Sequence, residues 1–425
     1  MQVPKQSSYV AIVSAIGSAI EYYSFITYIL LSAYLGKAFF PAFDPNAAML
    51  YTLLLFAVAY LIMPLSSLGF GFFADRIGRK KIMVIAIMLM AITTFSIGLL
   101  PTYKTIGIAA TVSLFVLRIL QGLAQGAELP GAITFVSEHA EDKNQARFCG
   151  WLFFAVGSGA LLSTFINYIL TSTLSQEAMF SYGWRIPFLI AGLLGIVGFL
   201  IRRYTEETPA FLKQQKLELA KIPIVTLLKE HWRKVLIGFG LVCGGSMLVN
   251  FGLALPGFLQ TSFGYDAKDT YLATTFAFAL DILLIVFATM ADRIGLRKFY
   301  LYGVLINLIC ILPMFALLLL QSKVALFAFI LLYHLLILFL AACYPAMLAR
   351  LFPTKIRYSG VSLSYLGAYS IAGFTPLIVT HLYASFKNIW IVAMFLSMAL
   401  LVSLVSGICY RCFTGSDYSR PTRCL

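Results

Sequence analysis

Long apolar stretches separated by short polar segments run through the sequence from one end to the other. An α-helix needs about 20 apolar residues to cross a bilayer, and twelve stretches come close to that length. They cover residues 9–35, 48–74, 82–100, 106–136, 148–170, 184–201, 235–263, 270–290, 299–320, 324–351, 359–383 and 389–410. This pattern predicts an all-α membrane protein with twelve transmembrane helices.

The composition is that of a membrane protein. Hydrophobic residues make up 61% of the 425 residues and charged residues 11%, which is more apolar surface than a soluble chain of this length can bury. The formal net charge of +14 would favour a nucleic-acid partner only if one folded domain carried a basic face. The charges lie instead in short segments between apolar stretches, so we expect lipid, and no nucleic acid, around the chain.

The basic residues also predict the orientation. Of the 31 Lys and Arg residues, 24 lie in segments that would face one side of the membrane, six face the other side, and Arg118 lies inside the fourth stretch. Positively charged loops stay in the cytoplasm, so the first side is cytoplasmic. Both termini are then expected in the cytoplasm.

Two features of the sequence occur twice, at equivalent places in its two halves. "ADRIGRKK" begins at Ala74 and "ADRIGLRK" at Ala291, each after the second apolar stretch of a set of six. Arg147 and Arg357 stand before the fifth and the eleventh stretch. Two parallel six-helix pseudo-repeats are the layout of many secondary transporters. The expected domains are a bundle of residues 1–203, a cytoplasmic loop of residues 204–234 and a bundle of residues 235–425 with a short cytoplasmic tail.

Several phrases resemble those of a known family. "GFFADRIGRKK" from Gly71 and "RILQGLAQG" from Arg118 are similar to the signature loop and the fourth-helix motif of the major facilitator superfamily. Other phrases resemble its metabolite:proton symporter branch, whose members carry proline and betaine, 2-oxoglutarate, citrate or shikimate. They are "AIEYYSFITY" from Ala19, "GAELPGA" from Gly126, "WRIPF" from Trp184, "EETPAF" from Glu206 and "FPTKIRYSGVSLSYLGAYSIAGFTPLI" from Phe352. The resemblance implies a multi-pass transporter of a bacterial cytoplasmic membrane.

The resemblance also implies that the repeated loops close the cytoplasmic side in one conformation and separate in the other. An Asp at such a place can face a helix N-terminus, where the peptide dipole favours negative charge. The second copy departs from the pattern, with Ala288 for the leading Gly and Leu296 for the middle Arg. Alternatively, the loops only anchor the topology through their positive charge. The expected gating residues are Gly71, Asp75, Arg76, Gly78, Arg79, Arg147, Asp292, Arg293, Gly295 and Arg357.

Charged residues inside the apolar stretches are candidates for function, because a charge in a bilayer is costly unless it is used. Four lie away from the ends of their stretches, where the bilayer interior is expected, namely Glu21, Arg118, Glu128 and Asp281. A carboxylate in a surrounding of low dielectric binds a proton more readily than one in water. We therefore expect Glu21, Glu128 and Asp281 as proton-coupling candidates. The symporter branch has a second acid three positions after the first Glu, where this chain has Ser24.

Polar residues at helical spacing predict a substrate path. Arg118, Gln121, Gln125 and Glu128 fall within about 80° of one another on a helix, and shorter polar rows lie on the first, seventh and eleventh stretches. The last two rows could equally be hydrogen-bonding contacts between helices. Arg suits a substrate carboxylate and Tyr rings suit a quaternary ammonium. The expected path residues are Arg118, Gln121, Gln125, Tyr22, Tyr28, Asn250, Tyr365 and Tyr369.

Other chemistry has no support in the sequence. It contains no phosphate-binding GxxxxGK[ST] loop, its four His residues lack metal-ligand spacing, and no set of nucleophile, base and orienting residue can be assembled. We expect no enzyme, no cofactor and no metal. The expected function is proton-coupled uptake of a small organic acid, amino acid or betaine by a monomer. The alternatives are a uniporter, an exporter or antiporter, and a membrane sensor that does not transport.

Overall fold

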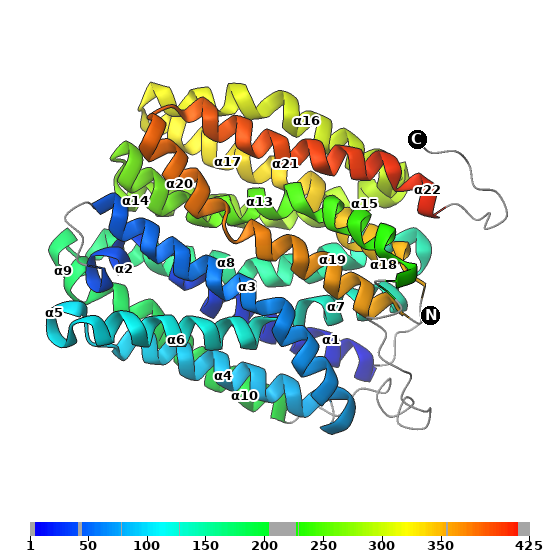
Figure 1. The fold of residues 1–425 in the computed structure, drawn as a ribbon, viewed down its shortest axis with the longest axis horizontal. Coiled ribbons are helices and arrows are strands. Elements are labelled where there is room, and N and C mark those ends of the chain that lie inside the picture. The colour runs from blue at the N-terminus through cyan, green and yellow to red at the C-terminus, as the bar shows by residue number, and fades with distance from the viewer. Residues whose placement is uncertain are drawn as a thin grey trace.

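The computed structural model describes residues 5–40, 45–77, 79–126, 128–203, 227, 229–353 and 356–414. Every regular element in these ranges is a helix (Figure 1). Those of the first half are α1 (Lys5–Leu30), α2 (Ser32–Phe39), α3 (Pro45–Ile77), α4 (Arg79–Leu99), α5 (Tyr103–Ile106), α6 (Ile108–Gln125), α7 (Glu128–His139), η1 (Asp142–Asn144), α8 (Gln145–Thr173), α9 (Gln176–Ser181), η2 (Gly183–Arg185) and α10 (Ile186–Arg203).

The second half repeats this succession of long helices. Its elements are α13 (Trp232–Phe263), α14 (Ala267–Ala279), η3 (Leu280–Ile282), α15 (Leu283–Ile294), α16 (Leu296–Ala316), η4 (Leu317–Leu320), α17 (Lys323–Ala341), α18 (Tyr344–Leu351), α19 (Arg357–Ala372), α20 (Thr375–Phe386), α21 (Ile389–Cys409) and α22 (Arg411–Thr414).

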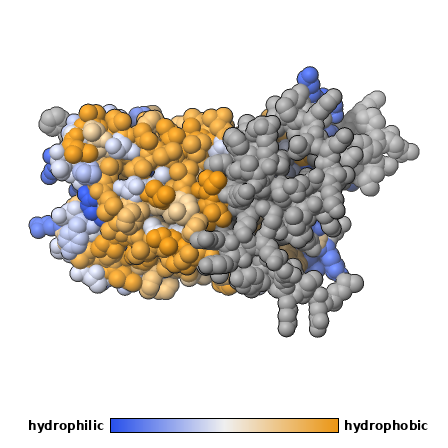
Figure 2. Space-filling view, turned by 90° about the horizontal axis from the view of Figure 1, so that it is seen from below, coloured by the Kyte–Doolittle hydropathy of each residue, from blue (hydrophilic) through white to orange (hydrophobic). Residues whose placement is uncertain are grey.

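The helices match the twelve apolar stretches. In the described part of the chain, ten helical spans are long and apolar enough to cross a membrane. α1 and α4 occupy the two remaining predicted stretches, and the apolar part of α4 is the shorter Val84–Leu99. Figure 2 shows the broad hydrophobic surface on the side of α4, α6 and α10, with hydrophilic residues gathered at one end. An apolar surface between polar ends is the surface expected of a protein that spans a lipid bilayer.

Several predicted stretches are two helices joined by a break. α6 gives way to α7, α17 to α18 and α19 to α20. Pro130, Pro345 and Pro376 lie in the first turn of the second helix of each pair. Proline fits a first turn but lacks the N–H that a continuous helix would use. Inside a membrane, such breaks are tolerated where they are buried in protein or line a cavity.

The helices form two bundles that lie side by side (Figure 1). α10 packs on α4 and α1 on α8 in the first, whereas α13 packs on α19 and α21 in the second. The bundles meet along two lines, where α8 packs against α14 and α15, and α3 packs against α19 and α20. Close packing beside the bundle interface depends on Gly159 of α8, because a Cβ there would collide with the backbone oxygen of Ala19 in α1.

Candidate transport site

A cavity of about 40 Å³ lies between the two bundles. Both bundles contribute to its wall, through α1, α3, α6, α7 and α8 on one side and α19 on the other. The lining residues are Ser18, Glu21, Tyr22, Phe25, Tyr60, Met63, Gln125, Leu129, Val156, Tyr365, Leu366 and Tyr369. Secondary transporters built from two such repeats bind their substrates at the interface between the repeats.

Glu21 supplies the carboxylate of this cavity. It lies in α1, its side chain is 2% exposed, and neither carboxylate oxygen has a hydrogen-bond partner in the described part of the chain. Ser24, which replaces the second acid of the resembled branch, donates instead to the Ile20 carbonyl oxygen at 2.9 Å. A buried carboxylate without a partner is costly as an anion, so Glu21 is suited to hold a proton or a ligand cation.

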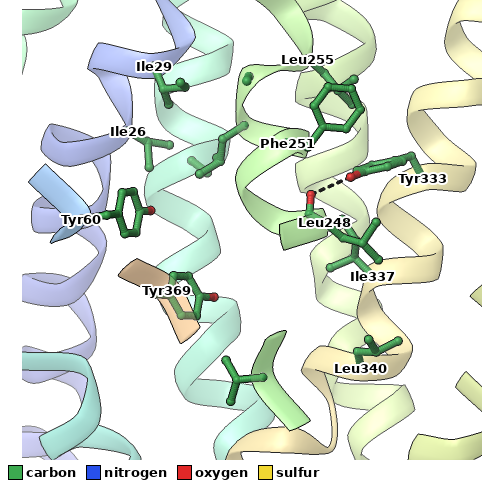
Figure 3. Packing of buried hydrophobic residues seen from close by; sticks show 14 of the residues in the cluster. Ile26, Ile29, Tyr60, Leu248, Phe251, Leu255, Tyr333, Ile337, Leu340 and Tyr369 are labelled. Carbon is green, nitrogen blue, oxygen red and sulfur yellow. Dashed lines mark hydrogen bonds between the residues drawn. The ribbon is translucent and has the colours of Figure 1, made fainter. Parts of the chain in front are cut away.

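Aromatic rings form a large part of the cavity wall. Tyr60 of α3 and Tyr369 of α19 stack across the bundle interface with ring centroids 6.1 Å apart and 16° between planes (Figure 3). Tyr369 stacks in turn on Tyr365 at 4.4 Å, and Phe25 meets Tyr60 edge to face at 5.2 Å. The faces of such rings carry negative charge density and attract cations. The wall therefore favours an ammonium group.

Arg118 lies just behind this wall and does not line the cavity. Its guanidinium carbon is 4.1 Å from the Tyr28 ring centroid, 5.0 Å from Phe25 and 5.7 Å from Phe56. The side chain has no exposed surface, and Nη1 donates to Gln121 at 2.6 Å. The described residues offer it no carboxylate. It is a buried cation held by aromatic faces and one amide.

The predicted polar row on the fourth stretch is split by these contacts. Gln125 lines the cavity, whereas Gln121 is buried behind it and donates to the Thr94 hydroxyl of α4 at 2.7 Å. The side chain of Glu128 lies outside the described residues. Sequence spacing placed these residues on one face, but the neighbouring helices α3 and α4 close over part of that face.

The remaining expected path residues separate into two groups. Tyr22, Tyr365 and Tyr369 line the cavity. Tyr28 packs on Arg118 and donates to the Thr52 carbonyl oxygen at 3.1 Å. Asn250 of α13 is fully buried and donates to the Ser246 carbonyl oxygen of its own helix at 2.9 Å, away from the cavity lining.

Asp281 occupies the bundle interface rather than the cavity. It lies in η3, the short turn of 3-10 helix between α14 and α15. A Cβ added to Gly157 of α8 would come within 2.7 Å of its Oδ2 atom, so the absence of a side chain at Gly157 makes room for this carboxylate. The two intramembrane acids that the structure describes, Glu21 and Asp281, thus stand at different places.

Polar contacts join the two bundles at the end that holds α18 and α22 in Figure 1, which the positive-inside rule predicts to be the cytoplasmic end. Asp292 of α15 accepts hydrogen bonds from the backbone N–H groups of Ala146 at 3.0 Å and Arg147 at 2.8 Å. These N–H groups belong to the first turn of α8 in the other bundle, where a carboxylate is favoured. Arg357 pairs with Glu138 at 3.0 Å. We call these contacts the inner latch.

The other expected gating residues are either exposed, in a glycine turn, or outside the described part of the structure. The Arg147 and Arg293 side chains are exposed, and Gly295 has φ of 103°, a conformation that favours glycine. In the first copy, Gly78 lies outside the described residues. The surroundings of Gly71 and the side chains of Asp75, Arg76 and Arg79 lie outside them too.

Contacts also join the bundles at the other end of the molecule. The Tyr271 hydroxyl of α14 donates to the Leu30 carbonyl oxygen of α1 at 2.6 Å, and the Thr261 hydroxyl of α13 lies 3.0 Å from the Met49 sulfur of α3. The cavity thus has inter-bundle contacts on both sides.

Comparisons with known proteins agree with this architecture. The profile of the Major Facilitator Superfamily matches residues 10–287, and that of "Sugar (and other) transporter" matches residues 226–420. The chain belongs to the major facilitator superfamily. A "Proline/betaine transporter" of Escherichia coli (strain K12) is 34% identical over 410 residues, covering 93% of this chain and 81% of the relative.

One further relative and one solved structure are informative. The "Glycine betaine/proline/ectoine/pipecolic acid transporter OusA" of Dickeya dadantii (strain 3937) is 31% identical over 408 residues, with 93% of this chain and 81% of that relative covered. The proton:xylose symporter XylE has a similar fold, with a TM-score of 0.74 at 16% identity over 96% of this chain and 97% of the other. The latter comparison bears on the fold alone.

Membership of the superfamily confirms several predictions. The protein has the twelve-helix fold, crosses the membrane several times and is a secondary active transporter of small organic solutes. Members of the superfamily are transporters and not enzymes, so the prediction of no enzyme is confirmed as well.

Sequence reasoning missed half of the transporter's cavity lining. Phe25, Tyr60, Met63, Val156 and neighbouring apolar residues were not among the expected path residues. Phe25 could have been found, since it follows Glu21 by one helical turn and shares its face. Tyr60 lies in a uniformly apolar stretch that carries no polar row, so the sequence has no signal for it.

Proposed function

We propose that this transporter imports a compact zwitterion of the proline or betaine type together with protons. One observation supports this most directly: the cavity between the bundles combines an unpartnered carboxylate, Glu21, with the rings of Tyr60, Tyr365 and Tyr369. Both features attract a positively charged group. The names of the proline and betaine carriers that the chain resembles point to the same class of solute.

We assign the coupling proton to Glu21. It is the described carboxylate that lines the cavity, so a proton on Glu21 and a substrate in the cavity would cross the membrane in the same conformational change. Arg118 keeps its proton under all ordinary conditions and is a fixed charge. Asp281 lies off the cavity and is the second candidate, and Glu128 stays a candidate from the sequence alone.

The inner latch supports a mechanism of alternating access. Asp292 and Arg357 join the bundles at the end that the distribution of Lys and Arg assigns to the cytoplasm. In this proposal, residues 1–203 and 235–425 are the moving domains and both termini are cytoplasmic. The cavity opens to the cytoplasm when the latch separates. A single chain contains both domains, so a monomer suffices.

Reconstitution into proteoliposomes tests the proposal. Uptake of labelled proline, glycine betaine, 2-oxoglutarate, citrate and shikimate is measured with and without an inward proton gradient. We expect gradient-driven accumulation of proline or glycine betaine by the wild type. Glu21→Gln keeps the size of the side chain but cannot release a proton, so accumulation should be lost. Asp281→Asn is the matched control and should keep it.

The other outcomes each contradict a stated part of the proposal. Equilibration that ignores the gradient would make the protein a uniporter. Transport only in the outward direction would make it an exporter, and binding without flux would make it a sensor. Loss of coupling in Asp281→Asn but not in Glu21→Gln would move the proton site to the bundle interface.

A further inference from the structure

The guanidinium of Arg118 has one edge that nothing in the described chain satisfies. Nη1 donates to Gln121, whereas Nε and Nη2 are buried and have no hydrogen-bond partner among the described residues. The N–H bonds of Nε and Nη2 point the same way along one edge of the planar group. That edge fits the two oxygens of a carboxylate in a bidentate pair. Buried donors without acceptors are costly, which favours an anion at this edge.

The cavity and Arg118 share one residue. Phe25 lines the cavity and also lies 5.0 Å from the guanidinium carbon. Glu21 precedes it by one helical turn on the same face of α1. The ring therefore stands between a cavity that favours an ammonium group and a cation that favours a carboxylate.

The size of the cavity requires something to move when substrate binds. A volume of about 40 Å³ holds only a few water molecules, and proline or glycine betaine is larger than that. Besides Arg118, the Phe25 ring has the aromatic neighbours Phe56 at 6.1 Å and Tyr60 at 5.2 Å. A phenyl ring makes no conventional hydrogen bond, so it can leave its place without leaving a polar group unpaired.

We propose that Phe25 is a movable partition between the two halves of the substrate site. When a zwitterion enters, the ring turns aside and the substrate carboxylate binds the Nε and Nη2 edge of Arg118. The ammonium end stays in the cavity against Glu21, Tyr60 and Tyr369. This inference rests on the proposed function and adds a selection rule: a solute needs both a compact ammonium and a carboxylate at short distance.

Binding of glycine betaine and of choline tests the rule, because both carry a trimethylammonium group and only the first carries a carboxylate. We expect the purified wild type to prefer glycine betaine. Arg118→Lys loses the bidentate pair and should reduce that preference by about 10- to 100-fold. Phe25→Leu should increase the preference for glycine betaine over choline, because the smaller leucine side chain is displaced from its place beside Arg118 at a lower cost in free energy.

Phe56→Leu is the matched control, because Phe56 also faces Arg118, at 5.7 Å, but does not line the cavity. It should leave the preference for glycine betaine over choline unchanged. Equal losses of both ligands in Arg118→Lys would overturn the proposal. So would identical behaviour of Phe25→Leu and Phe56→Leu.

Chemical labelling supplies a test that needs no substrate. Phenylglyoxal modifies accessible arginines, and peptide mass spectrometry measures the rate at Arg118 itself. We expect a slow rate in the wild type and in Phe56→Ala, and a rate at least about tenfold higher in Phe25→Ala, since removing the partition exposes the guanidinium. No difference between the two variants would refute the partition. A wild type that binds neither proline nor glycine betaine would refute the proposed function instead, and the labelling result would still stand.

Discussion

Replacing Asp292 by Asn tests the inner latch with the smallest change of shape. The carboxylate accepts two backbone N–H groups of the other bundle, at 3.0 Å and 2.8 Å. An Asn at this position keeps one acceptor oxygen, turns an NH₂ group toward the second N–H and removes the charge at the start of α8. Hydrogen bonds to a charged group contribute about 1.5–3 kcal/mol, and a charge at a helix N-terminus adds about 0.3–1 kcal/mol.

These contributions are reduced at a partly exposed site, so we expect a loss of about 2 kcal/mol in the closed conformation. That corresponds to an increase of roughly 30-fold in the ratio of inward-open to closed molecules. Leu129 lines the cavity from α7, and a cysteine at this position reports the opening. In inside-out vesicles, a membrane-impermeant maleimide should label Leu129→Cys roughly 30-fold faster when Asp292→Asn is added.

Glu141→Gln provides the control for charge. Glu141 lies near the same end of α8, but it pairs with Lys143 of its own bundle at 2.9 Å, and both side chains are largely exposed. Removing this acid should change the labelling rate by less than about twofold. If Asp292→Asn and Glu141→Gln label at the same rate, the hydrogen bonds of Asp292 do not hold the bundles together, and the account of the latch is wrong.

Two further variants test the packing and the aromatic wall. Gly159→Ala should lower stability by about 1–3 kcal/mol, because its Cβ meets the backbone at Ala19. In the control Gly131→Ala, the Cβ would make only an ordinary contact, 3.5 Å from the Tyr358 ring. Thermal unfolding in detergent measures both variants. Tyr369→Leu should weaken glycine betaine binding by about 2- to 30-fold through lost cation–π attraction. The control is Tyr383→Leu, because the Tyr383 ring stacks on Phe263 at 5.0 Å and does not line the cavity. This variant should leave glycine betaine binding unchanged. Equal effects of the two variants would show that the aromatic wall does not bind the substrate.

The sequence was sufficient for the fold because the bilayer acts on every residue of a span. A helix that faces lipid must be apolar over about 20 residues, so length and hydropathy alone locate the spans. The breaks within them are harder to foresee. Pro130, Pro345 and Pro376 mark where new helices begin, yet Pro64, Pro256 and Pro313 lie inside continuous helices. Neighbouring helices decide which prolines end a helix.

The candidate site was predictable in part. The helical period fixes which residues share a face of a helix, so spacing in the sequence could predict that Glu21, Tyr365 and Tyr369 line the substrate path. It could not foresee that Arg118 lies behind Phe25, since the depth of a side chain depends on the helices that pack over it. For Asp292, the motif suggested a helix N-terminus as the partner, and the donors are indeed backbone N–H groups. The motif could not tell that they belong to the first turn of α8.

The smallness of the cavity has a consequence for water balance. At roughly 10–15 Å³ of such space per molecule, a cavity of about 40 Å³ has room for about three water molecules. A transporter that returns empty through this conformation carries about three waters across the membrane in each cycle, where a wide vestibule would carry many more. Under the proposed function, each solute that is imported is then accompanied by little water in the carrier itself.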